Sequence, residues 1–170
     1  PGDYTITITG TINQFSFLLS THSRQKLINV LQWGPLIISN GGNQFALCSN
    51  LVLSSVTDTL YLVGITNLSN MFQSCNSLTT VNNMNSWSVS TVTNMSEMFS
   101  NAASFNQNLN SWNVSNVTNM NDMFYYATSY NQDLSHWCVT LITSLPAGFD
   151  TGATSWVLPS SRPVWGTCPP

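Results

Sequence analysis

Apolar residues recur along the chain at a spacing that indicates repeated units with one buried side each. Trp87, Trp112 and Trp137 follow one another at equal intervals, and similar sequence surrounds them: SWSVSTVTNMSEMF, SWNVSNVTNMNDMF and HWCVTLITSLPAGF. A fixed period of this kind is typical of repeat arrays, in which each unit buries its apolar side against its neighbours. We therefore predict a single array with an extended surface and no enclosed catalytic pocket.

Five repeats become visible when the chain is aligned on one phenylalanine of each unit. The first two intervals between these phenylalanines are equal, and each is two positions longer than the last two. The first repeat is degenerate, and Pro146 and Gly148 interrupt the last, which is how capping units of an array differ from inner ones. The aligned residues, expected to form a core ladder with the three tryptophans, are Phe45, Phe72, Phe99, Phe124 and Phe149.

The residues around the aligned phenylalanine predict a short helix. Met95, Met98, Phe99 and Ala102 follow the i, i+3, i+4, i+7 spacing of one helical face. An asparagine precedes this face in three repeats, where its side chain can accept hydrogen bonds from the free amides of a first helical turn. The predicted helix caps are Asn67, Asn94 and Asn119.

A second apolar pattern, L-x-x-W-x-V, follows the predicted helix and predicts a strand. It covers residues 109–114 and 134–139 and has the L-x-x-L-x-L spacing of a leucine-rich-repeat strand, with tryptophan at the central inward position. Stacked units of this kind predict an α/β repeat solenoid. We expect a right-handed, leucine-rich-repeat-like coil with short parallel strands on one face and short helices on the other.

The chain is expected to form one structural domain that is a fragment of a longer protein. Residues 1–35 are predicted to be an N-terminal β cap with the first strand position, since YTITIT near the start alternates with period two. Residues 36–156 contain about five of the repeats. Residues 157–170 are expected to form a C-terminal cap tail.

If Leu, Trp and Val of the predicted strands point inward, the residues between them point outward. They are polar and uncharged, and they fall in the same positions of successive repeats. Such a surface suits hydrogen bonding to sugar hydroxyls or to a protein of matching shape, or it is plain solvated sheet. The candidate ligand-binding residues are Thr59, Tyr61, Ser86, Ser88, Ser111, Asn113 and His136.

Composition excludes several classes of partner. Only 5% of the residues are charged, and the cations are Arg24, Lys26 and Arg162. Because nucleic acids and anionic membranes are bound by clusters of Lys and Arg, we expect neither as a partner. No apolar run reaches the roughly 20 residues needed to span a bilayer, so membrane insertion is not expected.

Four cysteines have no C-x-x-C pairing or histidine at ligand spacing, so no metal site is predicted. Cys48 and Cys75 occupy a position that alanine fills in later repeats, and we interpret them as small core residues. A disulfide between them is the alternative, but packed helices about 8–10 Å apart would exceed its reach.

Cys138 and Cys168 are predicted to form a disulfide. Cys138 takes an outward strand position and Cys168 ends the segment after the last repeat. A bridge between them would fold the tail over the exposed end of the array and cover its last edge. Such a bridge implies an oxidising compartment outside the cytosol.

No arrangement of residues points to catalysis. The acidic residues are scattered without a calcium-loop motif, the two histidines are isolated, and no Ser/His/Asp constellation can be drawn. We therefore expect neither an enzyme nor a cofactor.

The repeat signature resembles that of a known family of surface proteins. The pattern W-x-V-S-x-V-T-N-M-x-x-M-F-x-x-A-x-x-F-N-Q-x-L runs over residues 87–109 and again over 112–134, with Tyr130 in place of the second phenylalanine. In this respect the chain is similar to BspA-like leucine-rich-repeat surface proteins, which occur in bacteria and bacteriophages. The resemblance implies a secreted or surface-anchored protein with an adhesion or host-recognition role.

These observations favour a non-catalytic extracellular module for recognition or adhesion on a bacterial cell surface or a virion. Its partner would be a protein or glycan of a host or neighbouring cell. The alternative is an architectural domain, a decoration or spacer of a phage tail, capsid or filament, which packs against copies of itself.

Overall fold

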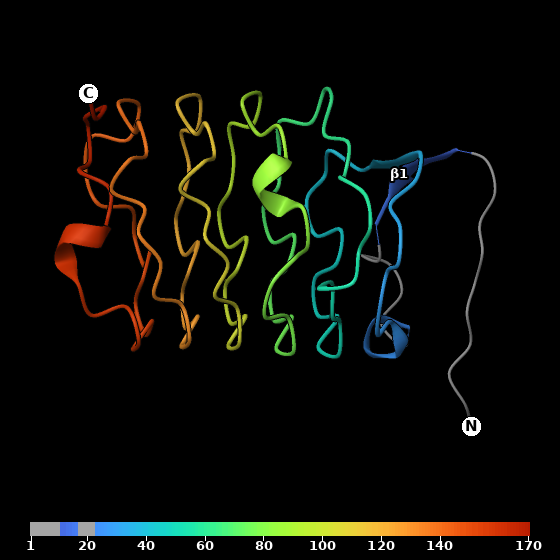
Figure 1. Cartoon of the computed structure of the whole chain (residues 1–170). Helices are drawn as coiled ribbons and strands as arrows, with labels where there is room; N and C mark the ends of the chain where they lie inside the picture. The colour runs from blue at the N-terminus through green and yellow to red at the C-terminus, as the bar shows by residue number, and fades with distance from the viewer. Residues whose placement is uncertain (1–10, 17–22) are drawn as a thin grey trace.

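The computed structural model describes residues 11–16 and 23–170. Successive segments, each as long as one sequence repeat, lie side by side along one axis from the N-terminal to the C-terminal end (Figure 1). We call each of these segments a layer. Part of the predicted N-terminal β cap, residues 1–10 and 17–22, lies outside the described residues.

The prediction of an α/β leucine-rich-repeat-like solenoid is wrong. The described residues contain no α-helix, and the only strands among them are two short ones that pair in parallel. Outside these strands, neighbouring layers share isolated parallel bridges, and most of the backbone consists of turns and irregular extended segments. The elements are β1 (Ile12–Phe15), η1 (Arg24–Lys26), β2 (Leu36–Ile38), η2 (Met84–Ser86) and η3 (Pro159–Ser161), where η denotes a 3-10 helix.

The segment that was predicted as a helix is a succession of tight turns. The amides of Met98 and Ala102 donate to carbonyls three residues earlier, at 3.3 and 3.0 Å. Glu97 and Asn101 have φ values of 55° and 57°, which a right-handed helix does not allow and which the third residue of a type II turn requires. The apolar side chains of this segment are nevertheless buried, because the turns also place positions i, i+3, i+4 and i+7 on one side.

Backbone hydrogen bonds between layers determine this conformation. In the layer that contains Phe99, every second amide donates to a carbonyl of the next layer, and the amides between them bond within the turns. An α-helix would direct all of these amides along its own axis and leave the layers without lateral bonds. The four lateral bonds run from Met95 to Asn119, Glu97 to Asn121, Phe99 to Met123 and Asn101 to Tyr125, with lengths of 2.9, 2.9, 2.9 and 2.6 Å.

The predicted helix caps are therefore also wrong, since no helix follows them. The side-chain carbonyls of Asn67, Asn94 and Asn119 accept from the amide two residues later, at 2.9, 3.0 and 3.0 Å. This is an Asx turn, which fixes the start of the first tight turn. Asparagine suits this position because its amide satisfies a backbone group locally.

Aromatic rings from successive layers stack through the core. The centroids of Phe45 and Phe72 are 5.7 Å apart, those of Phe72 and Phe99 5.9 Å, and those of Phe99 and Phe124 5.6 Å, with interplanar angles of 11–15°. These rings are fully buried. Each ring in this column contacts the ring of the layer before it and after it, so packing energy accumulates along the axis.

The tryptophans add a second stacked pair and polar bonds between layers. The rings of Trp87 and Trp112 stack with centroids 6.4 Å apart. The indole N–H of Trp112 donates to the Met84 carbonyl at 3.0 Å, and that of Trp137 donates to the Leu109 carbonyl at 2.9 Å. Each of these bonds reaches back to the preceding layer and satisfies a buried donor.

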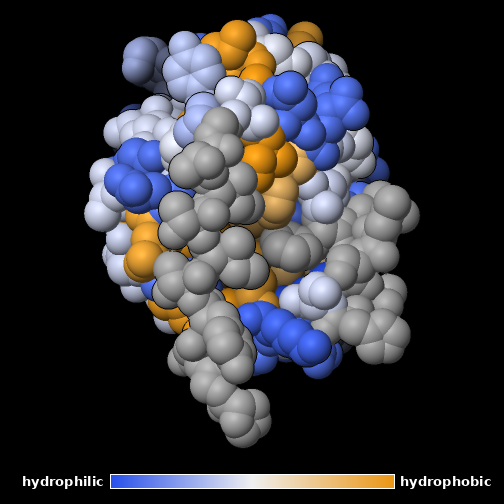
Figure 2. Space-filling model, turned by 90° about the vertical axis from the view of Figure 1, so that its right-hand side faces the viewer, coloured by the Kyte–Doolittle hydropathy of each residue, from blue (hydrophilic) through white to orange (hydrophobic). Residues whose placement is uncertain are grey.

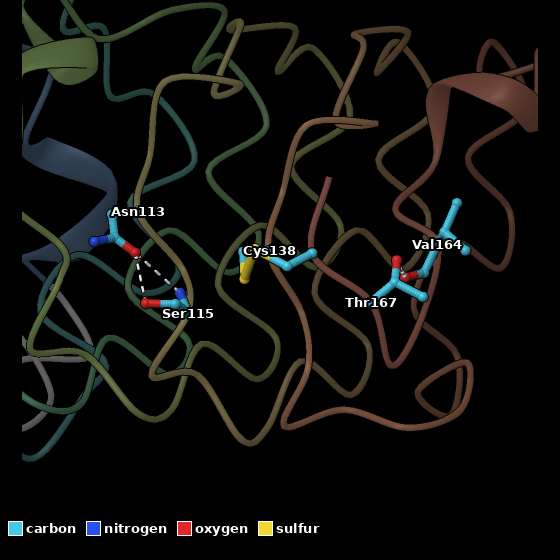
Figure 3. Close-up of a disulfide and its surroundings, with 6 residues drawn as sticks. Asn113, Ser115, Cys138, Val164 and Thr167 are labelled. Carbon is cyan, nitrogen blue, oxygen red and sulfur yellow. Dashed lines mark hydrogen bonds between the residues drawn. A yellow bond between two sulfur atoms is a disulfide. The ribbon is translucent and has the colours of Figure 1, made fainter. Parts of the chain in front are cut away.

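The chain tail packs against the last layer, and the predicted disulfide between Cys138 and Cys168 is confirmed (Figure 3). The amide of Leu134 donates to the Ser161 carbonyl at 2.7 Å, and the amide of Val139 to the Thr167 carbonyl at 2.8 Å. The tail thus supplies the acceptors that a further layer would provide. It covers the edge that would otherwise offer unpaired amides to another chain.

An ion pair fixes the same tail. The guanidinium of Arg162 bonds to the carboxylate of Asp150 and lies over the ring of Trp156, 4.9 Å from its centroid. It also donates to the Trp156 carbonyl at 2.8 Å. One of the few cations of the chain is therefore used to hold the C-terminal end together.

The last layer keeps the turns of the inner layers although Pro146 and Gly148 interrupt the repeat sequence. Gly148 has a φ of 62°, and the amide of Phe149 donates to the Pro146 carbonyl at 3.2 Å. In the preceding layer Asp122 has a φ of 55°, and the amide of Met123 likewise donates to the carbonyl three residues earlier at 3.2 Å. The turn of the last layer is therefore the same turn, shifted by one residue along the repeat.

At the N-terminal end, seen face on in Figure 2, apolar surface lies among polar surface. The exposed apolar residues of the first described layers include Ile28, Leu31, Ile37 and Leu47.

Removal of the disulfide is expected to destabilise the protein by about 3–4 kcal/mol, because it closes a loop with a sequence separation of 30 residues. Urea unfolding of the double variant Cys138→Ser/Cys168→Ser against the parent protein measures this difference. Dithiothreitol should lower the stability of the parent protein alone. A mass spectrum without reductant that shows free thiols at both positions would contradict the bridge.

Replacement of Ser74 distinguishes the turns from a helix. Ser74 has a φ of 57°, so Ser74→Gly should be more stable than Ser74→Ala by about 1 kcal/mol, because glycine has no Cβ penalty in the left-handed region. In a helix the order would be reversed by about the same amount. Chemical unfolding of both variants gives the sign.

Candidate functional site

The candidate ligand-binding residues are all exposed, and we call them the outward strip. They flank the buried residues Leu60, Trp87, Trp112 and Trp137, which anchor the backbone of successive layers. Tyr61, the aromatic residue among them, has 69% of its surface exposed. The strip consists of Thr59, Tyr61, Ser86, Ser88, Ser111, Asn113 and His136.

Hydrogen bonds between layers keep parts of the strip in register. The hydroxyl of Ser111 donates to the Asn85 carbonyl at 3.3 Å. The Nδ2 atom of Asn110 lies 3.0 Å from Nδ1 of His136 in the following layer. Since their neighbours hold these side chains, the strip presents polar groups at fixed intervals.

Asn113 shows how a strip residue is oriented by its own layer (Figure 3). Its Oδ1 atom accepts from the amide of Ser115 at 3.2 Å and from the Ser115 hydroxyl at 2.7 Å. No hydrogen bond of its Nδ2 group is formed within the described residues. Asn113 therefore retains a donor for a ligand while its acceptor fixes the side chain.

A shallow polar groove of about 400 Å³ lies beside the strip, and the sequence analysis missed it. It adjoins η2 and includes Ser86 of the strip. The signal that could have located it is a change in repeat length, because Phe72 and Trp87 lie two positions further apart than Phe99 and Trp112 do. The groove is lined by Ser54, Thr80, Val81, Asn82, Asn83, Met84, Asn85, Ser86 and Gln107.

The titratable groups with shifted pKa values lie apart from this groove. Hydrogen bonds from the amide and side chain of Ser135 lower the pKa of Asp133, which is exposed. Burial raises the pKa of the Tyr130 hydroxyl, and Asp133 adds to that shift. These groups belong to the layer packing, and the groove lining contains no ionisable side chain.

Within residues 11–16 and 23–170, no three His, Cys, Asp or Glu side chains gather closely enough to hold a metal ion. Cys48 and Cys75 are buried free thiols in adjacent layers, and the Sγ atom of Cys75 donates to the Phe45 carbonyl at 3.1 Å. Burial raises the pKa of Cys48 to about 11 and that of Cys75 further. Both cysteines thus stay protonated at neutral pH.

No helix among the described residues has the length and apolar character needed to cross a membrane.

A comparison of the chain with models of protein families identifies one matching family. The model of the family described as "Mycoplasma protein of unknown function, DUF285" matches residues 43–156. No curated protein matches the chain, and no solved structure matches it.

The two buried thiols are expected to resist modification in the folded protein. At pH 8 the thiolate fraction of Cys48 is small because its pKa is about 11, and burial also blocks access. Ellman's reagent should therefore detect no thiol in the native protein and two thiols after unfolding in guanidinium without reductant. Rapid reaction of the native protein would contradict this burial.

Proposed function

The chain belongs to the DUF285 family, and from that premise we propose that it is a non-catalytic extracellular recognition or adhesion module. The BspA-like signature in residues 87–109 and 112–134 supports a bacterial cell surface or a virion as its location. The disulfide between Cys138 and Cys168 agrees with an oxidising compartment. Its partner in this proposal is a protein or glycan on another cell.

The outward strip is the observation that carries this proposal. Seven polar side chains without a carboxylate or ammonium group stand exposed at fixed positions of successive layers. Rigid, preoriented hydrogen-bonding groups lower the entropic cost of binding. Tyr61 adds an aromatic anchor of the type enriched in recognition surfaces.

Variants of the strip test the proposal. We expect Tyr61→Ala and Ser88→Ala to weaken binding at least tenfold on arrays of immobilised oligosaccharides and extracellular proteins, because they remove an anchor and a hydrogen-bonding group. The matched control is Tyr126→Ala, which removes an exposed tyrosine from a turn outside the strip. Binding curves of the three variants and the parent protein on the same arrays provide the comparison.

Light scattering on the same variants separates recognition from an architectural role. Recognition is contradicted if the parent protein binds nothing on either array, or if Tyr61→Ala leaves every interaction unchanged. If the parent protein forms assemblies and Tyr61→Ala dissolves them, the strip serves packing between copies of the chain instead.

A further inference from the structure

The polar groove originates in a two-residue difference between neighbouring layers. Leu78 and Phe105 occupy the same position of their layers, six residues after the aligned phenylalanine. Leu78 precedes Trp87 by nine residues, whereas Phe105 precedes Trp112 by only seven. The longer segment forms η2, the short green helix in the middle of Figure 1. The shorter segment turns earlier, where the Asn108 side chain accepts from the amide of Asn110 at 2.9 Å. The groove lies at this step between a long and a short layer.

Amide side chains of the groove are each held to the protein at one end. The Nδ2 group of Asn82 donates to the Val56 carbonyl at 2.7 Å, and that of Asn83 donates to the Asp58 carbonyl at 3.4 Å. Their Oδ1 atoms make no hydrogen bond within the described residues. Two anchored asparagines thus leave two acceptors at the groove.

The groove lining also contains free donors. Gln107 of the shorter layer accepts from the amide of Val81 at 3.3 Å and donates to Oδ1 of Asn85 at 3.1 Å. This pairing fixes Asn85 by its oxygen and leaves its Nδ2 group without a partner in the described part of the chain. The Ser86 and Ser54 hydroxyls, which can donate or accept, complete the polar lining.

The lining determines the class of ligand. It has amides and hydroxyls but no carboxylate, ammonium, guanidinium or imidazole group, so it offers no counter-charge to an ion. A lining that offers both acceptors and donors matches vicinal hydroxyl groups, each of which donates one hydrogen bond and accepts others. Val81 and Met84 lie beneath the groove with their side chains buried in the core, so the groups that can contact a ligand are the polar ones.

We propose that the groove beside η2 is a binding subsite for a neutral oligosaccharide. This inference rests on the proposed recognition function and narrows its ligand to an uncharged glycan. The volume of about 400 Å³ falls in the range of roughly 300–1,000 Å³ typical of small-molecule sites. Ser86 belongs to both the groove and the outward strip, so a longer glycan can extend from the groove along the strip.

An array of neutral, sialylated and sulfated oligosaccharides tests the ligand class, and titration calorimetry with the tightest neutral binder tests the site. Ser54→Trp fills the groove from an exposed position and should weaken binding at least tenfold. Its control, Ser77→Trp, places the same bulk at an exposed serine outside the groove lining. Neutral sugars should bind in preference to anionic ones.

A second variant removes a groove acceptor without straining the backbone. Asn83 has a φ of 61°, so Asn83→Gly keeps its conformation and deletes only the amide. Asn101→Gly is the matched control, since Asn101 has a φ of 57° and lies outside the groove lining. We expect a loss of binding of about fivefold or more for the first and none for the second, with equal thermal stability of both.

Three outcomes overturn the groove proposal, and they differ in what they mean for recognition. If no neutral oligosaccharide binds but a protein ligand depends on Tyr61, recognition stands and the ligand class is wrong. If a neutral glycan binds and Ser54→Trp has no effect, the glycan lies outside the groove. If neither array yields a ligand, both proposals fail together.

Discussion

Lateral hydrogen bonding between backbones of adjacent layers is the constraint on which this structure depends. An amide that bonds to the next layer cannot also bond along its own segment, so lateral bonds at every second residue exclude an α-helix. The amides between them close tight turns, which requires φ values of 55° and 57° at Glu97 and Asn101. A left-handed conformation costs a non-glycine residue about 1–2 kcal/mol. The lateral bonds and the stacked phenylalanines offset this cost in each inner layer.

Lateral bonding also creates a requirement at the C-terminal end, where the last layer has no successor. The tail satisfies this requirement, because it supplies carbonyls to Leu134 and Val139 and is fastened by the Cys138–Cys168 disulfide. The turns of the last layer do not differ from those of inner layers, since Gly148 has a positive φ as Asp122 has in the layer before. The tail, and not the irregular sequence of the last turns, therefore ends the stack.

The sequence predicted burial better than it predicted conformation. The apolar positions of the repeat and the pairing of Cys138 with Cys168 follow from period and position, and both are found in the structure. The helices were wrong because an i, i+3, i+4, i+7 pattern records which side chains face inward, and consecutive turns meet the same condition. Gly148 and the asparagines at turn positions were signals of positive φ that the apolar pattern outweighed. The groove could not be found from side-chain types alone, since it depends on a length difference between two neighbouring layers.

The scarcity of charge has a structural cause. Equivalent side chains of adjacent layers lie next to one another, so a repeated charge would face its own copy at a cost of about 1 kcal/mol per pair even in water. Asn, Ser and Thr avoid this repulsion and bond between layers instead, as Asn116 does to the Ser90 carbonyl at 2.8 Å. A uniform polar surface is thus what the stacking alone requires. The groove beside η2 is different, because there the layers change length, and amide side chains that bond to a neighbouring layer at one end have no partner at the other end among the described residues. The break in the repeat, and the unused hydrogen-bonding groups that it exposes, are therefore stronger evidence for recognition than the polar composition of the whole.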